Sequence, residues 1–158
     1  MKRWIVFGVL AAILGSGSLM AGQQDRVPTP GQPNVAQPPD VPATELNLGS
    51  IRIPRSVKVG GQTLAPGSYQ IRVTAEMAKP DATGLTEPLY RWAEFRQGGQ
   101  VRGREVVTIV PDAEARLVVK DAPPPAGGSK VQVLRGNDYV RVWFNRGGTH
   151  YLLHLPAA

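Results

Sequence analysis

From residue 45 onward, short runs rich in Val, Ile, Tyr and Trp alternate with turn residues, and no stretch sustains the 3.6-residue apolar period of a helix. Adjacent glycines, which supply the positive φ angles of tight hairpin turns, recur at residues 60–61, 98–99, 127–128 and 147–148. The pattern predicts strands at residues 47–53, 56–59, 69–75, 89–97, 100–110, 115–120, 130–135, 138–145 and 149–155. Such a succession indicates an all-β fold, an antiparallel β-sandwich or small barrel of about 7–9 short strands.

Two stretches of the domain read as loops instead of strands. Residues 76–88 contain Pro80, Gly84 and Pro88, and residues 121–129 contain three consecutive prolines. Proline and glycine at these densities end regular strands, so we expect a long loop and a stiffer connector.

The first 22 residues have the three parts of a secretory signal peptide. Lys2 and Arg3 are followed by an apolar run over residues 5–14 and then by small residues. An uncleaved membrane anchor is the alternative, because residues 4–24 carry no charge and approach membrane-spanning length. In both cases we expect the remainder of the chain to be exported.

A proline-rich segment separates this leader from the β domain. Residues 23–44 hold six prolines and almost no apolar side chains to bury. That composition predicts a disordered, extended linker. The expected organisation is therefore a signal peptide at residues 1–22, a linker at 23–44 and a β domain at 45–158.

The amino-acid composition excludes several kinds of functional site. The chain has no cysteine and only two histidines, which excludes disulfides, thiolate metal sites and cysteine nucleophiles, and we expect no metal or other cofactor. The net charge is +6, from 18 basic and 12 acidic residues, and removal of Lys2 and Arg3 would leave +4. Such a surface favours anionic envelope polymers or lipid headgroups. We expect no nucleic-acid partner, because no recognition helix or basic-aromatic RNA motif is present.

One strand carries a recognisable opening motif. Tyr69, Ile71 and Val73 share one face of a half-buried strand, and Pro66 and Gly67 before it suit the centre of a type II turn. Residues 57–69 read V-K-V-G-G-Q-T-L-A-P-G-S-Y.

This motif resembles the opening of small exported bacterial all-β proteins of unknown function, usually written with L-P-A-G-x-Y. Here Pro and Ala are exchanged, and residues 142–153 resemble the closing hairpin of the same proteins, so the resemblance covers roughly 25 of the 158 positions. A similar turn occurs in prealbumin-like and collagen-adhesin B-type sandwiches. The resemblance implies a β-sandwich in the periplasm or secreted from a bacterium, and it implies no activity.

The hairpin over residues 89–110 offers a candidate catalytic pair. A two-residue turn at Gly98 and Gly99 would pair Trp92 with Glu105 and would place Glu94 and Glu105 on one face. Two carboxylates beside a tryptophan are typical of a glycoside-active enzyme. The alternative, which we favour, is that both carboxylates pair with nearby arginines.

The last three predicted strands provide the candidate binding face. Val140, Val142 and Phe144 alternate with Tyr139, Arg141 and Trp143, so the two sets face opposite sides of the strand. The valines and Phe144 form the expected core. The opposite face then presents the candidate ligand-binding residues Tyr139, Arg141, Trp143, His150 and His154.

Aromatic rings beside arginine donors suit a glycan or an anionic polymer. The alternative is that these aromatics pack across strands or lie under the loop at residues 76–88. His150 and His154 lie four residues apart on a strand, about 13 Å, so they do not share a metal ion.

The sequence therefore favours an exported, non-enzymatic binding module for an envelope component, either a glycan or an anionic polymer. A structural or assembly partner of an envelope protein is the first alternative. A glycoside-active enzyme is the second, because no nucleophile motif or phosphate loop is visible.

Overall fold

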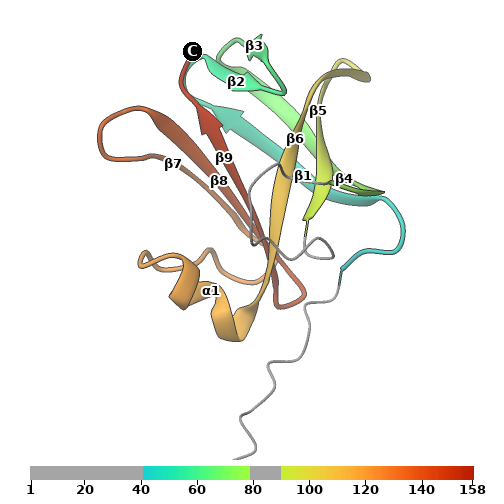
Figure 1. Ribbon diagram of the computed structural model, residues 1–158, viewed down its shortest axis with the longest axis vertical. Helices are drawn as coiled ribbons and strands as arrows, with labels where there is room; N and C mark the ends of the chain where they lie inside the picture. Colours follow the sequence, from blue (N-terminus) through green and yellow to red (C-terminus); the bar gives the residue numbers. More distant parts are fainter. Residues whose placement is uncertain (1–40, 79–89) are drawn as a thin grey trace, which may run out of the picture. The chain divides into compact units, whose positions relative to one another are not determined.

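The computed structural model describes residues 41–78 and 90–158 (Figure 1). The predicted signal peptide, most of the predicted linker and most of the predicted 76–88 loop lie outside these residues. Nine strands and one helix are present in the described part of the chain. In order they are β1 (Leu46–Ile53), β2 (Val57–Val59), β3 (Gln62–Leu64), β4 (Gly67–Met77), β5 (Tyr90–Gln97), β6 (Gln100–Pro111), α1 (Asp112–Val118), β7 (Ser129–Val133), β8 (Tyr139–Arg146) and β9 (Thr149–Pro156).

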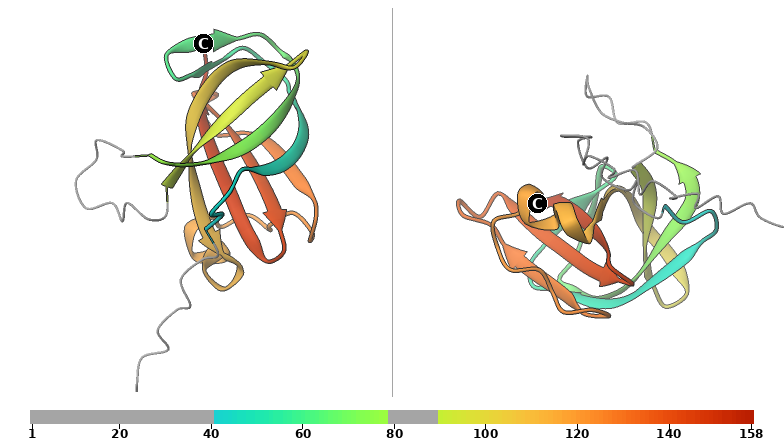
Figure 2. Two further views of the ribbon diagram at one scale, coloured as in Figure 1. Left: turned by 90° about the vertical axis from the view of Figure 1, so that its right-hand side faces the viewer. Right: turned by 90° about the horizontal axis from the view of Figure 1, so that it is seen from below.

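Seven strands form one antiparallel sheet in the order β1-β4-β5-β6-β9-β8-β7. The sheet curls until it is nearly closed into a barrel, with β1 and β7 as its two edges (Figure 2). The β2–β3 hairpin forms a separate small sheet at one end of the barrel, and α1 lies at the other end. The predicted all-β class and strand number are confirmed.

The inner face of the sheet holds the main core. Alternate residues of the strands contribute to it, as the period of two in a half-buried strand requires. Tyr69 is 3 % exposed, and its hydroxyl donates to the carbonyl of Ala65 at 2.8 Å. Phe95 meets the Tyr69 ring edge to face, with 6.4 Å between centroids. The predicted common face of Tyr69, Ile71 and Val73 is confirmed, and it is the buried face of β4.

The predicted strand at residues 115–120 is wrong, because residues 112–118 form helix α1. Asp112 and Glu114 lie in its first turn and Arg116 in its last, which complements the helix dipole. Ala115 is buried, and it packs with Val119 in a second apolar cluster outside the barrel. Among the described residues, no helix is long and apolar enough to cross a membrane.

Three of the four glycine pairs form the predicted hairpin turns. Residues 60–61, 98–99 and 147–148 all have positive φ angles, as a type I′ turn requires at both central positions. The fourth pair lies in the connector before β7, where the Gly128 N–H donates to the Pro125 carbonyl. The type II turn expected at Gly67 is wrong, because Gly67 begins β4 without a positive φ.

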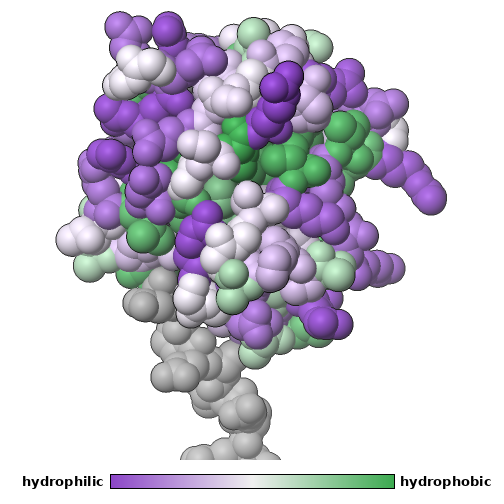
Figure 3. Space-filling model, turned by 180° about the vertical axis from the view of Figure 1, so that it is seen from behind, coloured by the Kyte–Doolittle hydropathy of each residue, from purple (hydrophilic) through white to green (hydrophobic). Residues whose placement is uncertain are grey.

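Arginine side chains link the two edges of the sheet. Arg146 of β8 donates to the carbonyl of Leu48 in β1 and to that of Gly128 just before β7. Toward the other end, Arg55 donates to the carbonyl of Asn137 in the turn after β7. The face of the molecule in Figure 3 is mostly hydrophilic, with a band of hydrophobic residues across its middle.

Candidate functional site

The structure confirms the predicted faces of β8 but not the expected exposure of Trp143. Val140, Val142 and Phe144 lie in the main core, and Trp143 lies on the outer side of the sheet. Trp143 is nevertheless fully buried, because α1 and the strand ends around it form the second cluster. The expectation of a partly exposed Trp143 is therefore wrong. The covering element is α1, which includes part of the segment predicted as a strand at residues 115–120.

His150 is fully buried beside Trp143. The indole Nε1–H donates to Nδ1 of His150 at 2.9 Å, and Nε2 of His150 lies 2.8 Å from Oδ1 of Asp112. Because the indole only donates, Nδ1 accepts and the proton of the neutral ring is on Nε2. Asp112 is the first residue of α1, so this chain of hydrogen bonds ties the helix to β8 and β9.

The other three predicted site residues stay near the surface. Tyr139 is 45 % exposed, and Arg141 donates from Nε to Nε2 of His154 at 3.1 Å. Arg141 also reaches Asp121, with 3.4 Å between nitrogen and oxygen. Partial burial of the imidazole, and secondarily the charge of Arg141, lower the pKa of His154. This group remains a candidate surface, but it holds one exposed aromatic ring and an arginine that is already paired.

The expected pairing of Trp92 with Glu105 is wrong. Phe95 pairs with Gly103 and Arg96 pairs with Val101, so Arg102 is an extra residue in a β-bulge. The bulge shifts the register by one, and Trp92 pairs with Val106. A shift of one residue reverses the faces of a strand.

The two carboxylates of the candidate catalytic pair therefore lie on opposite faces. Glu105 reaches the hairpin that caps the barrel, where it accepts the Gly60 N–H at 3.0 Å. Glu94 stays on the outer face, 3.0 Å from Arg96 and 3.7 Å from Arg104. Their shared geometry, which the glycosidase hypothesis requires, is absent.

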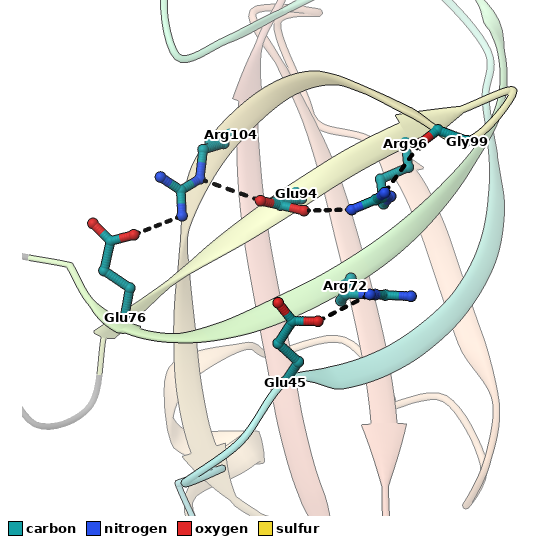
Figure 4. A network of polar contacts seen from close by, with 7 residues as sticks. All are labelled: Glu45, Arg72, Glu76, Glu94, Arg96, Gly99 and Arg104. Atoms are coloured by element: carbon teal, nitrogen blue, oxygen red, sulfur yellow. Dashed lines mark hydrogen bonds and ion pairs between the residues drawn. The ribbon is translucent and has the colours of Figure 1, made fainter.

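Figure 4 shows Glu94 within a chain of ion pairs on the outer face of β4, β5 and β6. Arg104 joins it to Glu76 at 2.7 Å, and the Arg104 guanidinium also lies 5.8 Å from the centroid of the Trp92 ring. A separate pair joins Arg72 and Glu45 at 2.9 Å. These contacts confirm that Glu94 is paired with arginines, and they hold Arg104 against Trp92.

The bulge residue Arg102 lines a pocket between β6 and the β2–β3 hairpin, which we call the hairpin pocket. Its volume is about 380 Å³, and its walls are formed by Val59, Gly60, Gln62, Trp92, Val101, Arg102, Gly103 and Arg104. The hairpin lies tightly on β6, since a Cβ on Gly60 would be 2.5 Å from the Arg104 carbonyl oxygen. A Cβ on Gly103 would be 2.8 Å from Val59.

The hairpin pocket combines an aromatic wall with two arginines, Arg102 and Arg104, that differ in their ion pairs. Trp92 is half-buried and Val101 is 44 % exposed, so apolar surface is open to a ligand. Arg104 is engaged by Glu76 and Glu94. Within the described ranges, by contrast, the Arg102 side chain has no hydrogen bond or ion pair. This arrangement provides a stacking surface and a guanidinium that the described residues leave without a partner.

The sequence pattern singles out Trp92 but does not indicate this pocket. The available signal was Gly103, at which a bulge is favoured in a strand that is otherwise β-branched and charged. The contact of Gly60 with β6 joins residues more than forty positions apart, and no local pattern reports it.

Comparison with protein-family models, with curated proteins and with solved structures gives no match. The family resemblance of the opening and closing motifs stays a prediction. A function for the chain is therefore inferred from its own side chains.

Proposed function

We propose that the β domain is a non-enzymatic binding module of an exported protein, and that it binds an anionic glycan in the hairpin pocket. The single observation that carries the proposal is the half-buried Trp92 beside Arg102, whose side chain has no partner among the described residues, in one open pocket. An aromatic ring offers a flat apolar surface to a sugar ring, and a guanidinium matches a planar anionic group.

Pocket size and surroundings support this proposal. Ligand pockets commonly measure about 300–1,000 Å³ and combine apolar walls with a few polar groups, and the hairpin pocket, at about 380 Å³, falls in that class. The separation of Glu94 and Glu105 on opposite faces argues for binding without hydrolysis. The leader pattern of residues 1–22 supports export, which would bring the domain to envelope glycans.

The experiment is a glycan array that carries acidic and neutral glycans, probed with the full chain. We expect binding to acidic glycans, and we expect Trp92→Ala to weaken it at least about tenfold, the equivalent of 1.4 kcal/mol. Trp92→Phe keeps an aromatic wall and should retain most of the affinity. Thermal melting of each variant separates lost binding from lost folding.

Tyr139→Ala is the matched control, because Tyr139 is the exposed aromatic of the other candidate surface. Loss of binding in Tyr139→Ala with retention in Trp92→Ala would move the site to β8 and overturn the hairpin pocket. Absence of binding to every glycan on the array would overturn the function itself.

A further inference from the structure

The hairpin pocket has a neighbour on the far side of Arg102. A second pocket of about 420 Å³ is lined by residues of β3, of the turn after it and of the β5–β6 hairpin, among them Thr63 and Gln97. Gln62 and Arg102 belong to the walls of both pockets. The two pockets therefore adjoin, and we refer to the second as the amide pocket.

The two halves of this groove differ in chemistry. The hairpin pocket offers the Trp92 ring and aliphatic side chains, whereas the amide pocket offers the Gln97 amide and the Thr63 hydroxyl, and the Gln62 amide lines both. Amide and hydroxyl groups both donate and accept, which suits ligands rich in hydroxyls. A single sugar ring would use one half, and a chain of sugars would use both.

Arg102 lines both halves of the groove, and it is the residue at the bulge. It is the extra residue opposite the Phe95–Arg96 step, so no residue of β5 pairs with it. Bulges re-aim side chains and are frequent beside binding sites. Its guanidinium is exposed and, in the part of the chain that the structure describes, has no acidic partner.

From this placement we infer that the groove binds a linear acidic oligosaccharide, with one anionic substituent held by Arg102 and sugar rings on both sides of it. The inference rests on the proposed function and specifies its ligand class. The shared chemistry is a planar or tetrahedral oxyanion on a sugar chain, either a carboxylate or a sulfate, and guanidinium groups bind both through paired hydrogen bonds.

Isothermal titration calorimetry on the full chain tests this inference. The probes are galacturonic acid, its dimer, tetramer and hexamer, the methyl-esterified tetramer, and a sulfated galactan tetramer without carboxylates. We expect affinity to rise from the monomer to the tetramer and then to level off as the groove is filled. The neutral methyl ester should bind more weakly than the free acid, and the sulfated probe shows which oxyanion is preferred.

Arg102→Gln should weaken binding of the acidic tetramer about tenfold or more and leave the methyl ester nearly unchanged. Arg135→Gln is the matched control, because Arg135 is also exposed and unpaired among the described residues, and the substitution removes the same charge. Gln97→Ala should weaken the tetramer but not the monomer, as expected of a group in the second half of the groove.

The outcomes separate the two proposals. The extended groove would be overturned if monomer and tetramer bound with equal affinity, or if Arg102→Gln and Arg135→Gln lost equal affinity. A loss of affinity confined to Trp92→Ala would leave the hairpin pocket intact. Binding of the acidic probes that neither Trp92→Ala nor Arg102→Gln changes would overturn both. If none of these probes binds, but the array shows acidic glycans bound through Trp92, only the linear-oligosaccharide inference is overturned.

Discussion

Trp143 donates its indole N–H to His150 at 2.9 Å in a site closed to solvent, and the two rings meet nearly edge to face at 5.6 Å between centroids. The second nitrogen of His150 reaches Asp112 at the start of α1. Trp143 therefore faces outward from the sheet but is buried under α1, in the second apolar cluster. Its role is to hold α1 against the barrel, and the tryptophan of the proposed binding site is the partly exposed Trp92.

Replacement of Trp143 should destabilise the fold strongly. We expect Trp143→Ala to lower the free energy of unfolding by about 3–5 kcal/mol, because a large buried ring is lost. Trp143→Phe keeps much of the volume but leaves Nδ1 of His150 without a donor, at a cost of about 1–3 kcal/mol. Urea unfolding followed by circular dichroism measures both.

Tyr139→Ala is the control on the same strand and the same face, and its exposed ring should change stability by less than about 0.5 kcal/mol. Equal unfolding midpoints for Trp143→Ala and the unmodified chain would show that α1 does not cover Trp143.

The strand pattern predicted most of this fold for a physical reason. Alternation of apolar and polar residues records which face is buried, and Val140, Val142 and Phe144 do enter the core as expected. The pattern does not record what covers the other face. The short helix α1 was missed because seven residues give less than two full turns of a helical period, and its apolar residues also suit a strand.

A pair of glycines with matched backbone angles tests the docking of the β2–β3 hairpin. Gly60 and Gly98 have φ angles of 55° and 58°, so alanine meets the same left-handed strain, about 1–2 kcal/mol, at both. Only at Gly60 would the new Cβ meet another backbone atom, the Arg104 carbonyl oxygen. Gly60→Ala should therefore lower the melting temperature more than Gly98→Ala, and it should also weaken glycan binding. Equal melting temperatures would mean that the hairpin does not lie against β6.

Arg146 should stabilise the junction of the two sheet edges. A lysine keeps the charge but lacks the guanidinium fork that reaches the carbonyls of Leu48 and Gly128. We expect Arg146→Lys to cost about 1.5–3 kcal/mol and to accelerate amide hydrogen exchange in β1 and β7. Arg52→Lys is the control, because Arg52 is exposed on β1 and unpaired among the described residues. Exchange that is faster throughout the barrel, with no preference for the edges, would contradict this role.

The candidate site was harder to predict than the fold, since its geometry depends on a register change. Val101 and Arg102 read as ordinary alternating residues of a strand. Regular pairing after a two-residue turn would place Glu105 on the same face as Glu94. The bulge at Arg102 reverses that relationship. Gly103 indicates that a bulge is tolerated there, but its contact with Val59, from a hairpin distant in the sequence, is not visible in any local pattern.

His154 gives the domain a specific pH dependence. Its pKa is lowered below the ordinary value of about 6.5 by partial burial and then by Arg141, so the folded protein binds its proton less tightly than the unfolded chain does. Stability from this residue is therefore complete above about pH 6.5 and declines as the pH falls below it, because the unfolded state takes up more protons. Protonation of His154 also removes the acceptor for the Nε–H of Arg141.

We expect His154→Gln to reduce the dependence of the unfolding free energy on pH between about 5 and 7, measured by urea unfolding at each pH. An unchanged slope in His154→Gln would assign the acid sensitivity to other groups and would contradict the lowered pKa.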